Sequence, residues 1–141
     1  MNILQLDLPS ARVLDLYAGS GALGLEALSR GAVAADFVEK DPKSLRVLQE
    51  NIETLGARDL ATVHRRAALP FAEALGALDY DVVFADPPYA SADAVILAER
   101  WKASPFSTVL SIEHAAKIAM PDGGETRKYG STAITFYRTE E

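Results

Sequence analysis

Short apolar runs of strand length alternate along this chain with longer segments in which apolar residues recur at helical spacing. Glycines and prolines separate the two kinds of segment. Parallel strands need long crossover connections, so a regular strand–helix alternation predicts a mostly parallel sheet with helices on both faces. We therefore expect one doubly wound α/β domain that spans residues 1–141.

The pattern predicts each strand and helix in turn. We expect strands over residues 12–17, 34–39, 61–65, 81–85 and 108–113, and helices over residues 22–29, 41–56, 70–78 and 92–102. Two further β-like runs, residues 125–129 and 132–138, predict a closing antiparallel hairpin around Gly130-Ser131. In such a sheet the segments after the first and fourth strands meet at the carboxyl edge, where ligands bind.

The loop after the first predicted strand has the pattern G-x-G-x-x-G, formed by Gly19, Gly21 and Gly24. Glycines let the backbone turn sharply and approach a ligand, and Glu39 after the next strand is placed to bind two ribose hydroxyls. The pattern also fits an NAD-binding domain, or a tight turn that only serves packing. Asp15 favours S-adenosylmethionine, because a carboxylate attracts its ammonium and sulfonium groups and repels a pyrophosphate. Alternatively, Asp15 caps the amides of the loop.

A second unusual segment, Asp86-Pro87-Pro88-Tyr89, directly follows the fourth predicted strand. Two prolines fix the backbone and remove two donors, which leaves a rigid edge that presents carbonyls. The Asp86 carboxylate and the Pro87 carbonyl can hold both hydrogens of an exocyclic amino group and turn its lone pair toward a methyl donor. Tyr89 is placed to stack on an extruded base. The alternative is a proline-stiffened turn with an N-capping aspartate.

Composition excludes several other kinds of site. The chain has no cysteine, which excludes disulfides, zinc–thiolate sites and cysteine nucleophiles. Its net charge of −6 leaves only a local patch to hold nucleic acid, and Arg65-Arg66 and Arg127-Lys128 are either parts of such a patch or solvated surface. His64 and His114 are expected to be structural rather than metal ligands. Without a signal segment or a long apolar run, we expect a cytoplasmic protein with no membrane partner.

Several segments together carry a resemblance to a known family: residues 13–28 (VLDLYAGSGALGLEAL), Phe37-Val38-Glu39, Asn51, residues 83–89 (VFADPPY) and Lys128-Tyr129-Gly130. They resemble the bacterial 16S ribosomal RNA guanine-N2 methyltransferases of the RsmD type. The resemblance implies a Rossmann-like methyltransferase sheet of seven strands, S-adenosylmethionine as cofactor and the 2-amino group of a guanine as target. It also implies a partner, either ribosomal RNA or the assembled small ribosomal subunit.

The resemblance assigns roles to individual residues. It assigns binding of the target amine to Asp86, Pro87 and Tyr89. It assigns binding of the cofactor to Asp15, Tyr17, Gly19, Ser20, Gly21, Glu39, Lys40 and Ala67. Family members commonly contact the adenine through an acidic or amide side chain near the end of the third strand. This chain has His64-Arg65-Arg66-Ala67-Ala68 there, so the backbone of Ala67 is expected to serve instead.

A second departure concerns the start of the chain, because members of the family usually begin earlier, with a basic segment and a helix. We expect residues 1–4 (MNIL) to be the end of that helix. The missing segment would carry part of the RNA-binding and cofactor-covering surface.

Motifs of the Asp-Pro-Pro-Tyr kind also serve methylation of DNA adenine or cytosine and of protein glutamine. A cofactor-binding module that does not catalyse is a further alternative.

Overall fold

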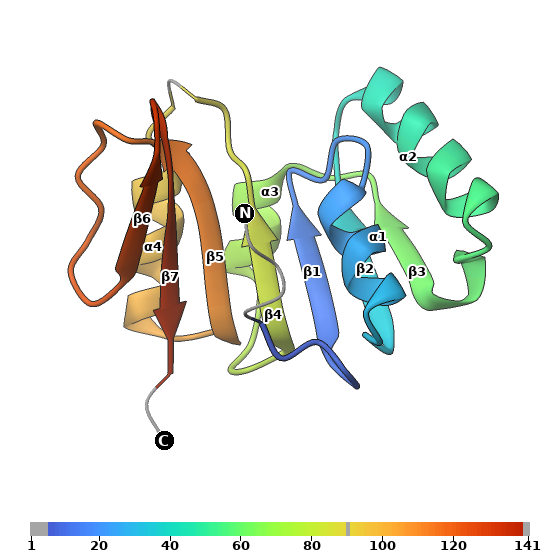
Figure 1. Cartoon of the computed structure of the whole chain (residues 1–141), viewed down its shortest axis with the longest axis horizontal. Coiled ribbons are helices and arrows are strands. Elements are labelled where there is room, and N and C mark those ends of the chain that lie inside the picture. Colours follow the sequence, from blue (N-terminus) through green and yellow to red (C-terminus); the bar gives the residue numbers. More distant parts are fainter. Residues whose placement is uncertain (1–5, 90, 140–141) are drawn as a thin grey trace.

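The computed structural model describes residues 6–89 and 91–139, which fold around one seven-stranded sheet (Figure 1). The strands are β1 (Arg12–Leu16), β2 (Ala34–Val38), β3 (Ala61–His64), β4 (Tyr80–Ala85), β5 (Ser107–Ala115), β6 (Glu125–Tyr129) and β7 (Thr132–Arg138). Their order across the sheet is β3-β2-β1-β4-β5-β7-β6. The strands from β3 to β5 are parallel, whereas β7 pairs antiparallel with both β5 and β6. The expected doubly wound sheet with a closing hairpin is confirmed.

Helices cover both faces of the sheet (Figure 1). The helices are α1 (Ala22–Ser29), α2 (Pro42–Thr54), α3 (Ala68–Glu73) and α4 (Asp93–Ala103), with a short 3₁₀ turn at Arg58–Leu60. One hydrophobic core joins α1 and α2 to the sheet, and a second joins α3 and α4 to its other face. The central strands are buried on both sides, which explains why they read as continuous apolar runs.

The start of α2 follows from its local sequence. The Asp41 carboxylate accepts a hydrogen bond from the Ser44 amide at 2.9 Å, and Pro42 occupies the first turn. Proline is favoured there because its fixed φ suits a helix and its missing donor would have no partner. This helix was expected over residues 41–56, and the structure confirms it with α2 ending at Thr54.

The expectation for α3 was wrong in its bounds. A helix was predicted over residues 70–78, but it runs from Ala68 to Glu73. Pro70 does not begin the helix and instead lies inside its first turn, where a missing N–H costs no intrahelical bond. After the helix, the Gly76 amide donates to Asp79 at 2.7 Å and Leu78 takes a positive φ of 52°. These conformations exclude a continued helix.

The register of the central strands positions the two distinctive loops. Leu16 in β1 lies opposite Ala85 in β4, so both strands end at the same edge of the sheet. The glycine loop follows β1, and residues 86–89 follow β4, which confirms the expected meeting of these loops at the carboxyl edge. Leu6 and Leu8 are buried in the core on the α1 face. The expectation about residues 1–4 lies outside the described residues.

Candidate active site

The glycine loop between β1 and α1 is shaped by residues with positive φ. Tyr17, Gly19 and Gly21 have φ values of 58°, 56° and 83°. A Cβ placed on Gly19 would meet no atom within 4 Å, whereas one on Gly24 would lie 2.4 Å from Cε1 of Phe37. The two glycines therefore serve different purposes. Gly24 allows α1 to pack on the sheet, and Gly19 leaves room for a ligand above the loop.

Glu39 joins the glycine loop to the end of β2. Its Oε1 accepts a hydrogen bond from the Gly19 amide at 2.8 Å. Its Oε2 accepts from the amides of the two following residues, Lys40 and Asp41, at 3.1 and 2.9 Å. Each carboxylate oxygen has two lone-pair sites, so Oε1 retains acceptor capacity. Glu39 therefore stabilises the loop and still offers an acceptor at the place predicted for a ribose.

Asp15 lies beneath the loop and is only 3% exposed. Its Oδ2 accepts a hydrogen bond from the Gly24 amide at 3.0 Å, which is the capping contact considered as its alternative role. Burial raises the pKa of Asp15 to about 7, although the Gly24 amide opposes this rise and the charges of Asp86 and Glu39 add to it. The negative charges of Asp86 and Glu39 beside Asp15 therefore create a place where a cation is stabilised.

The loop that follows β4 presents two acceptors at the same edge. Among the residues described here, no hydrogen-bond donor reaches the Asp86 carboxylate or the Pro87 carbonyl. The next carbonyl along the chain, that of Pro88, is occupied, because it accepts from the amide and the hydroxyl of Ser91 at 3.0 and 2.9 Å. Partial desolvation raises the pKa of Asp86, and the negative charge of Glu113 on the adjacent strand raises it further.

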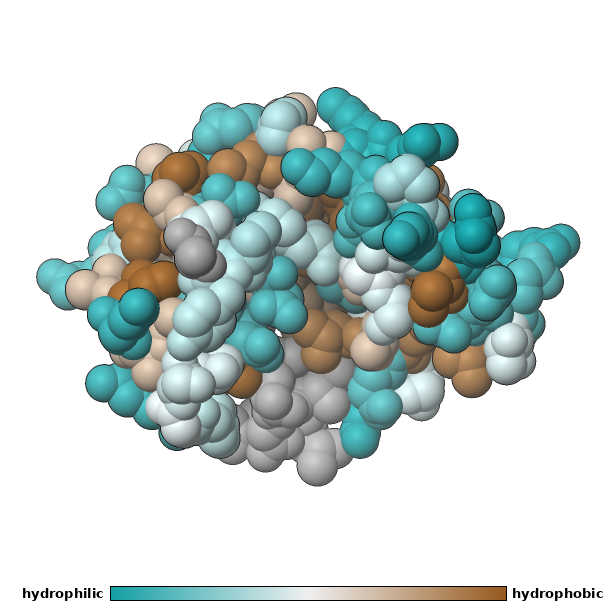
Figure 2. Space-filling view, turned by 90° about the horizontal axis from the view of Figure 1, so that it is seen from above, coloured by the Kyte–Doolittle hydropathy of each residue, from teal (hydrophilic) through white to brown (hydrophobic). Residues whose placement is uncertain are grey.

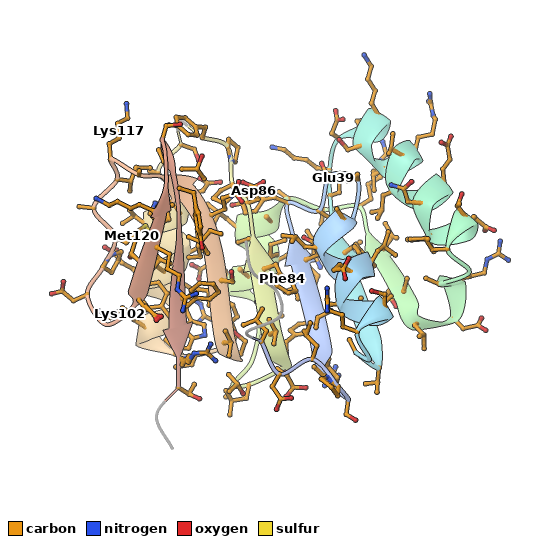
Figure 3. The ribbon with its side chains drawn as sticks, in the orientation of Figure 1. Glu39, Phe84, Asp86, Lys102, Lys117 and Met120 are labelled. Atoms are coloured by element: carbon orange, nitrogen blue, oxygen red, sulfur yellow. The ribbon has the colours of Figure 1, made fainter. Side chains whose placement is uncertain are left out.

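A cavity of about 470 Å³ opens at this edge, within the size range of small-molecule sites. Glu39 and Asp86 both line this cavity, and Figure 3 shows them at the upper ends of β2 and β4. Figure 2 looks down on the edge, where mostly hydrophilic residues surround a central hollow. Of the predicted site residues, five line the cavity: Tyr17, Glu39, Lys40, Ala67 and Asp86. The others do not line it: Asp15, Gly19, Ser20, Gly21, Pro87 and Tyr89.

Sequence reasoning missed Asp93, which lines the cavity. Arg66 also lines it, although the sequence suggested for this residue only a nucleic-acid patch or solvated surface. The Tyr17 hydroxyl donates to Oδ2 of Asp93 at 2.8 Å, and burial together with this bond raises the pKa of Tyr17. An acidic residue in the first turn of a helix is common, so Asp93 gave no functional signal. Arg66 is exposed, and its guanidinium lies over the ring of Phe71, 5.5 Å from the centroid.

The two histidines have structural partners. His64 Nε2 lies 3.4 Å from Asp36 Oδ2, and its ring packs on Phe71. His114 is buried, with Nε2 2.7 Å from the Thr135 hydroxyl. Within residues 6–89 and 91–139, no group of three His, Cys, Asp or Glu residues is arranged to hold a metal ion. The same residues contain no helix whose length and apolar content would let it cross a membrane.

Comparison with known proteins gives consistent similarities. A family model described as "Conserved hypothetical protein 95" matches residues 1–138. YlbH of Bacillus subtilis (strain 168) is 33% identical over 138 residues, covering 90% of this chain and 75% of that protein. The ribosomal RNA small subunit methyltransferase D of Haemophilus influenzae is 31% identical over 132 residues, covering 89% and 68%. A solved structure of a conserved hypothetical protein from Streptococcus pyogenes matches with a TM-score of 0.82 and 33% identity, covering 94% and 88%.

Proposed function

Because this chain belongs to the family described as conserved hypothetical protein 95, which includes the RsmD-type enzymes, we propose that it is an S-adenosylmethionine-dependent rRNA methyltransferase. Its proposed target is the exocyclic 2-amino group of a guanine in small-subunit ribosomal RNA. The substrate is either the RNA itself or the assembled small subunit, which agrees with a cytoplasmic place of action. Relatives named as methyltransferases of ribosomal RNA support the substrate class, and the geometry of the carboxyl edge of the sheet supports methylation of an amino group.

The observation that carries the proposal is the pair of unused acceptors after β4. The Asp86 carboxylate and the Pro87 carbonyl have no hydrogen-bond donor among the residues that the structure describes. An exocyclic amine brings two hydrogens, which match two acceptors. The amine of guanine is a poor nucleophile because its lone pair is delocalised into the ring, so fixing both hydrogens is a productive way to orient that lone pair.

The charges of the edge support S-adenosylmethionine rather than NAD. Asp15 is buried, and its carboxyl group is further destabilised as an anion by Asp86 and Glu39. A ligand with an ammonium and a sulfonium relieves this repulsion, whereas an anionic pyrophosphate increases it. The open space above Gly19 and the acceptor capacity of Glu39 fit the amino-acid and ribose portions of such a ligand. When bound, this cofactor supplies an electrophilic methyl group to the target nitrogen.

The residues of the loop after β4 then have distinct roles. Asp86 accepts a hydrogen from the amine, and its raised pKa makes it a better acceptor for the proton that the amine loses. Pro87 accepts the second hydrogen through its carbonyl. Tyr89 is exposed and offers its ring to the extruded base. Tyr17 and Asp93, hydrogen-bonded to each other, connect the glycine loop to the helix that follows this segment.

A labelling experiment tests the proposal. The protein is incubated with S-adenosylmethionine carrying a labelled methyl group and, separately, with small ribosomal subunits, free 16S RNA, DNA or release factors. We expect label on RNA as N2-methylguanine, and a loss of at least about a hundredfold in rate for Asp86→Ala. Asp59→Ala, an exposed aspartate on the 3₁₀ turn, is the matched control and should keep full activity. Label on DNA or protein alone would overturn the assignment of substrate.

A further inference from the structure

The carbonyl of Ser131, in the turn between β6 and β7, joins three segments of the chain. It accepts a hydrogen bond from the Ala116 amide at 2.8 Å and another from the Tyr89 hydroxyl at 3.1 Å. Since β7 runs antiparallel to β5, this turn lies at the carboxyl edge of the parallel strands. The turn is therefore fixed beside the loop that carries Asp86 and Pro87.

Two tyrosines are exposed around this junction. Tyr89 is 54% exposed and Tyr129 is 51% exposed. The hydrogen bond from the Tyr89 hydroxyl to Ser131 holds one ring against the turn. Tyr129 is the last residue of β6 and lies opposite Thr132 across the same turn. The hydrogen bond fixes the Tyr89 ring, and both exposed rings offer flat surfaces to nucleobases.

Two lysines accompany the tyrosines. Lys117 follows Ala116 directly, and Lys128 precedes Tyr129. Both side chains are exposed, and neither ammonium group has an ion pair or a hydrogen bond among the described residues. Figure 3 shows Lys117 at the upper edge, at the same end of the sheet as Asp86, whereas Lys102 lies at the opposite end. In a chain of net charge −6, this edge thus carries two cations that are free for a partner.

Arg127, the neighbouring basic residue, is used differently. Its guanidinium pairs with Glu125 at 3.1 Å and lies over the ring of Phe136, 5.8 Å from the centroid. Of the pair that the sequence singled out, only Lys128 is therefore available to a phosphate. In the part of the chain that the structure describes, β6 is the edge strand of the sheet, and no other described strand covers its outer side.

We propose that Lys117, Lys128 and Tyr129 form a rim that binds single-stranded RNA next to the target guanine. The lysines contact phosphates, and Tyr129 stacks on a base that neighbours the target. RNA is the partner that this chemistry fits, because unpaired bases present faces for stacking and every nucleotide brings a negative charge. The inference rests on the proposed function and adds to it the surface that holds the substrate strand.

The rim is tested in the full chain with two variants, Lys117→Ala/Lys128→Ala and Tyr129→Ala. Binding of a fluorescein-labelled single-stranded oligoribonucleotide is followed by anisotropy over a series of salt concentrations, independently of methylation. We expect affinity for RNA to fall about tenfold in each variant. For the double variant, the slope of log affinity against log salt concentration should become less steep by about 1.4, because each of the two lost phosphate contacts contributes about 0.7. Calorimetric binding of S-adenosylmethionine should remain unchanged, which shows that the variants fold.

The matched control is Lys43→Ala/Lys102→Ala, which removes two exposed lysines away from the rim and should leave both readouts at the wild-type level. Tyr129→Phe should retain affinity, because the ring and not the hydroxyl is required. Equal RNA affinity and equal salt dependence in wild type and the rim double variant would overturn the inference. If the wild-type chain methylates no RNA but the rim variants lose RNA binding, the proposed function fails and the rim stands.

Discussion

Three acidic residues, Asp15, Glu39 and Asp86, lie near the carboxyl ends of three different strands. The charges of Asp86 and Glu39 raise the pKa of Asp15, and the charge of Glu113 raises the pKa of Asp86. A protein without a cationic ligand gains nothing from such an arrangement, because a buried carboxylate weakens the folded state unless it is neutralised. At the scale of single residues, the site is thus arranged for a positive ligand at the expense of stability in the free protein. Two predictions follow from the pKa values of these side chains.

Asp15→Asn should stabilise the free protein at pH 8. The pKa of Asp15 is raised to about 7 in the folded state, above its ordinary value of 3.8. Its ionisation therefore weakens the fold increasingly as pH rises from about 4 to about 7, and the penalty is fully present above that range. Asparagine keeps an acceptor for the Gly24 amide and has no charge. We expect urea unfolding to show a gain of a few kcal/mol at pH 8 and little change near pH 4.

The same variant should bind S-adenosylmethionine at least about tenfold more weakly, because one of the charges that attracts the ligand is gone. Asp59→Asn provides the control, since Asp59 is exposed on the 3₁₀ turn. An unchanged pH dependence of stability in Asp15→Asn would show that Asp15 does not titrate in the predicted range.

Glu113→Gln should shift the acid limb of the methylation rate to lower pH. Partial desolvation raises the pKa of Asp86, and the charge of Glu113 raises it further. Removing that charge lowers the pKa of Asp86, so Asp86 stays ionised to a lower pH. We expect a shift on the order of half a pH unit in the profile of kcat/KM. Glu50→Gln, on the exposed side of α2, should leave the profile in place.

At the scale of elements, α2 supports the glycine loop as well as the core. The side-chain amide of Asn51 donates a hydrogen bond to the backbone carbonyl of Ser20 at 2.9 Å, and this bond fixes the glycine loop to α2. Asn51→Ala should weaken binding of S-adenosylmethionine about fivefold, the effect of one hydrogen bond of roughly 1 kcal/mol. Calorimetry measures this, with Gln49→Ala on the same helix as control. Equal affinity in the two variants would show that the loop keeps its shape without Asn51.

Much of the fold could be predicted from the sequence, because strand and helix periods differ and a regular strand–helix alternation implies a mostly parallel sheet. The bounds of α3 could not, because Pro70 suggests a helix start although proline is tolerated throughout the first turn. The loops of the site were found through their unusual composition. Asp93 was not found, because its role depends on a hydrogen bond to Tyr17, 76 residues away in sequence. Contacts of that kind follow from packing and not from local pattern.

At the scale of the whole molecule, the cofactor should stabilise the fold as one unit. A ligand at a hundred times its dissociation constant adds about 2.7 kcal/mol, which for a chain of this size raises Tm by roughly 5–10 °C. We expect S-adenosylmethionine to produce this rise in a thermal unfolding experiment and NAD at the same concentration to produce none. A comparable rise with NAD would contradict the argument from charge. Repeating the measurement with Asp15→Asn should give a smaller rise.

The strand order has a consequence for folding during synthesis on the ribosome. β1 is synthesised first but lies between β2 and β4 in the finished sheet, and the Arg12 amide donates to Asp81, 69 residues later. At about 5–20 residues synthesised per second, β4 leaves the ribosome on the order of several seconds after β1, and until then one edge of β1 has no partner. During that interval an apolar strand edge is open to pairing with other nascent chains. Slower translation across residues 60–80 should therefore increase aggregation, whereas a pause after β5 should matter less.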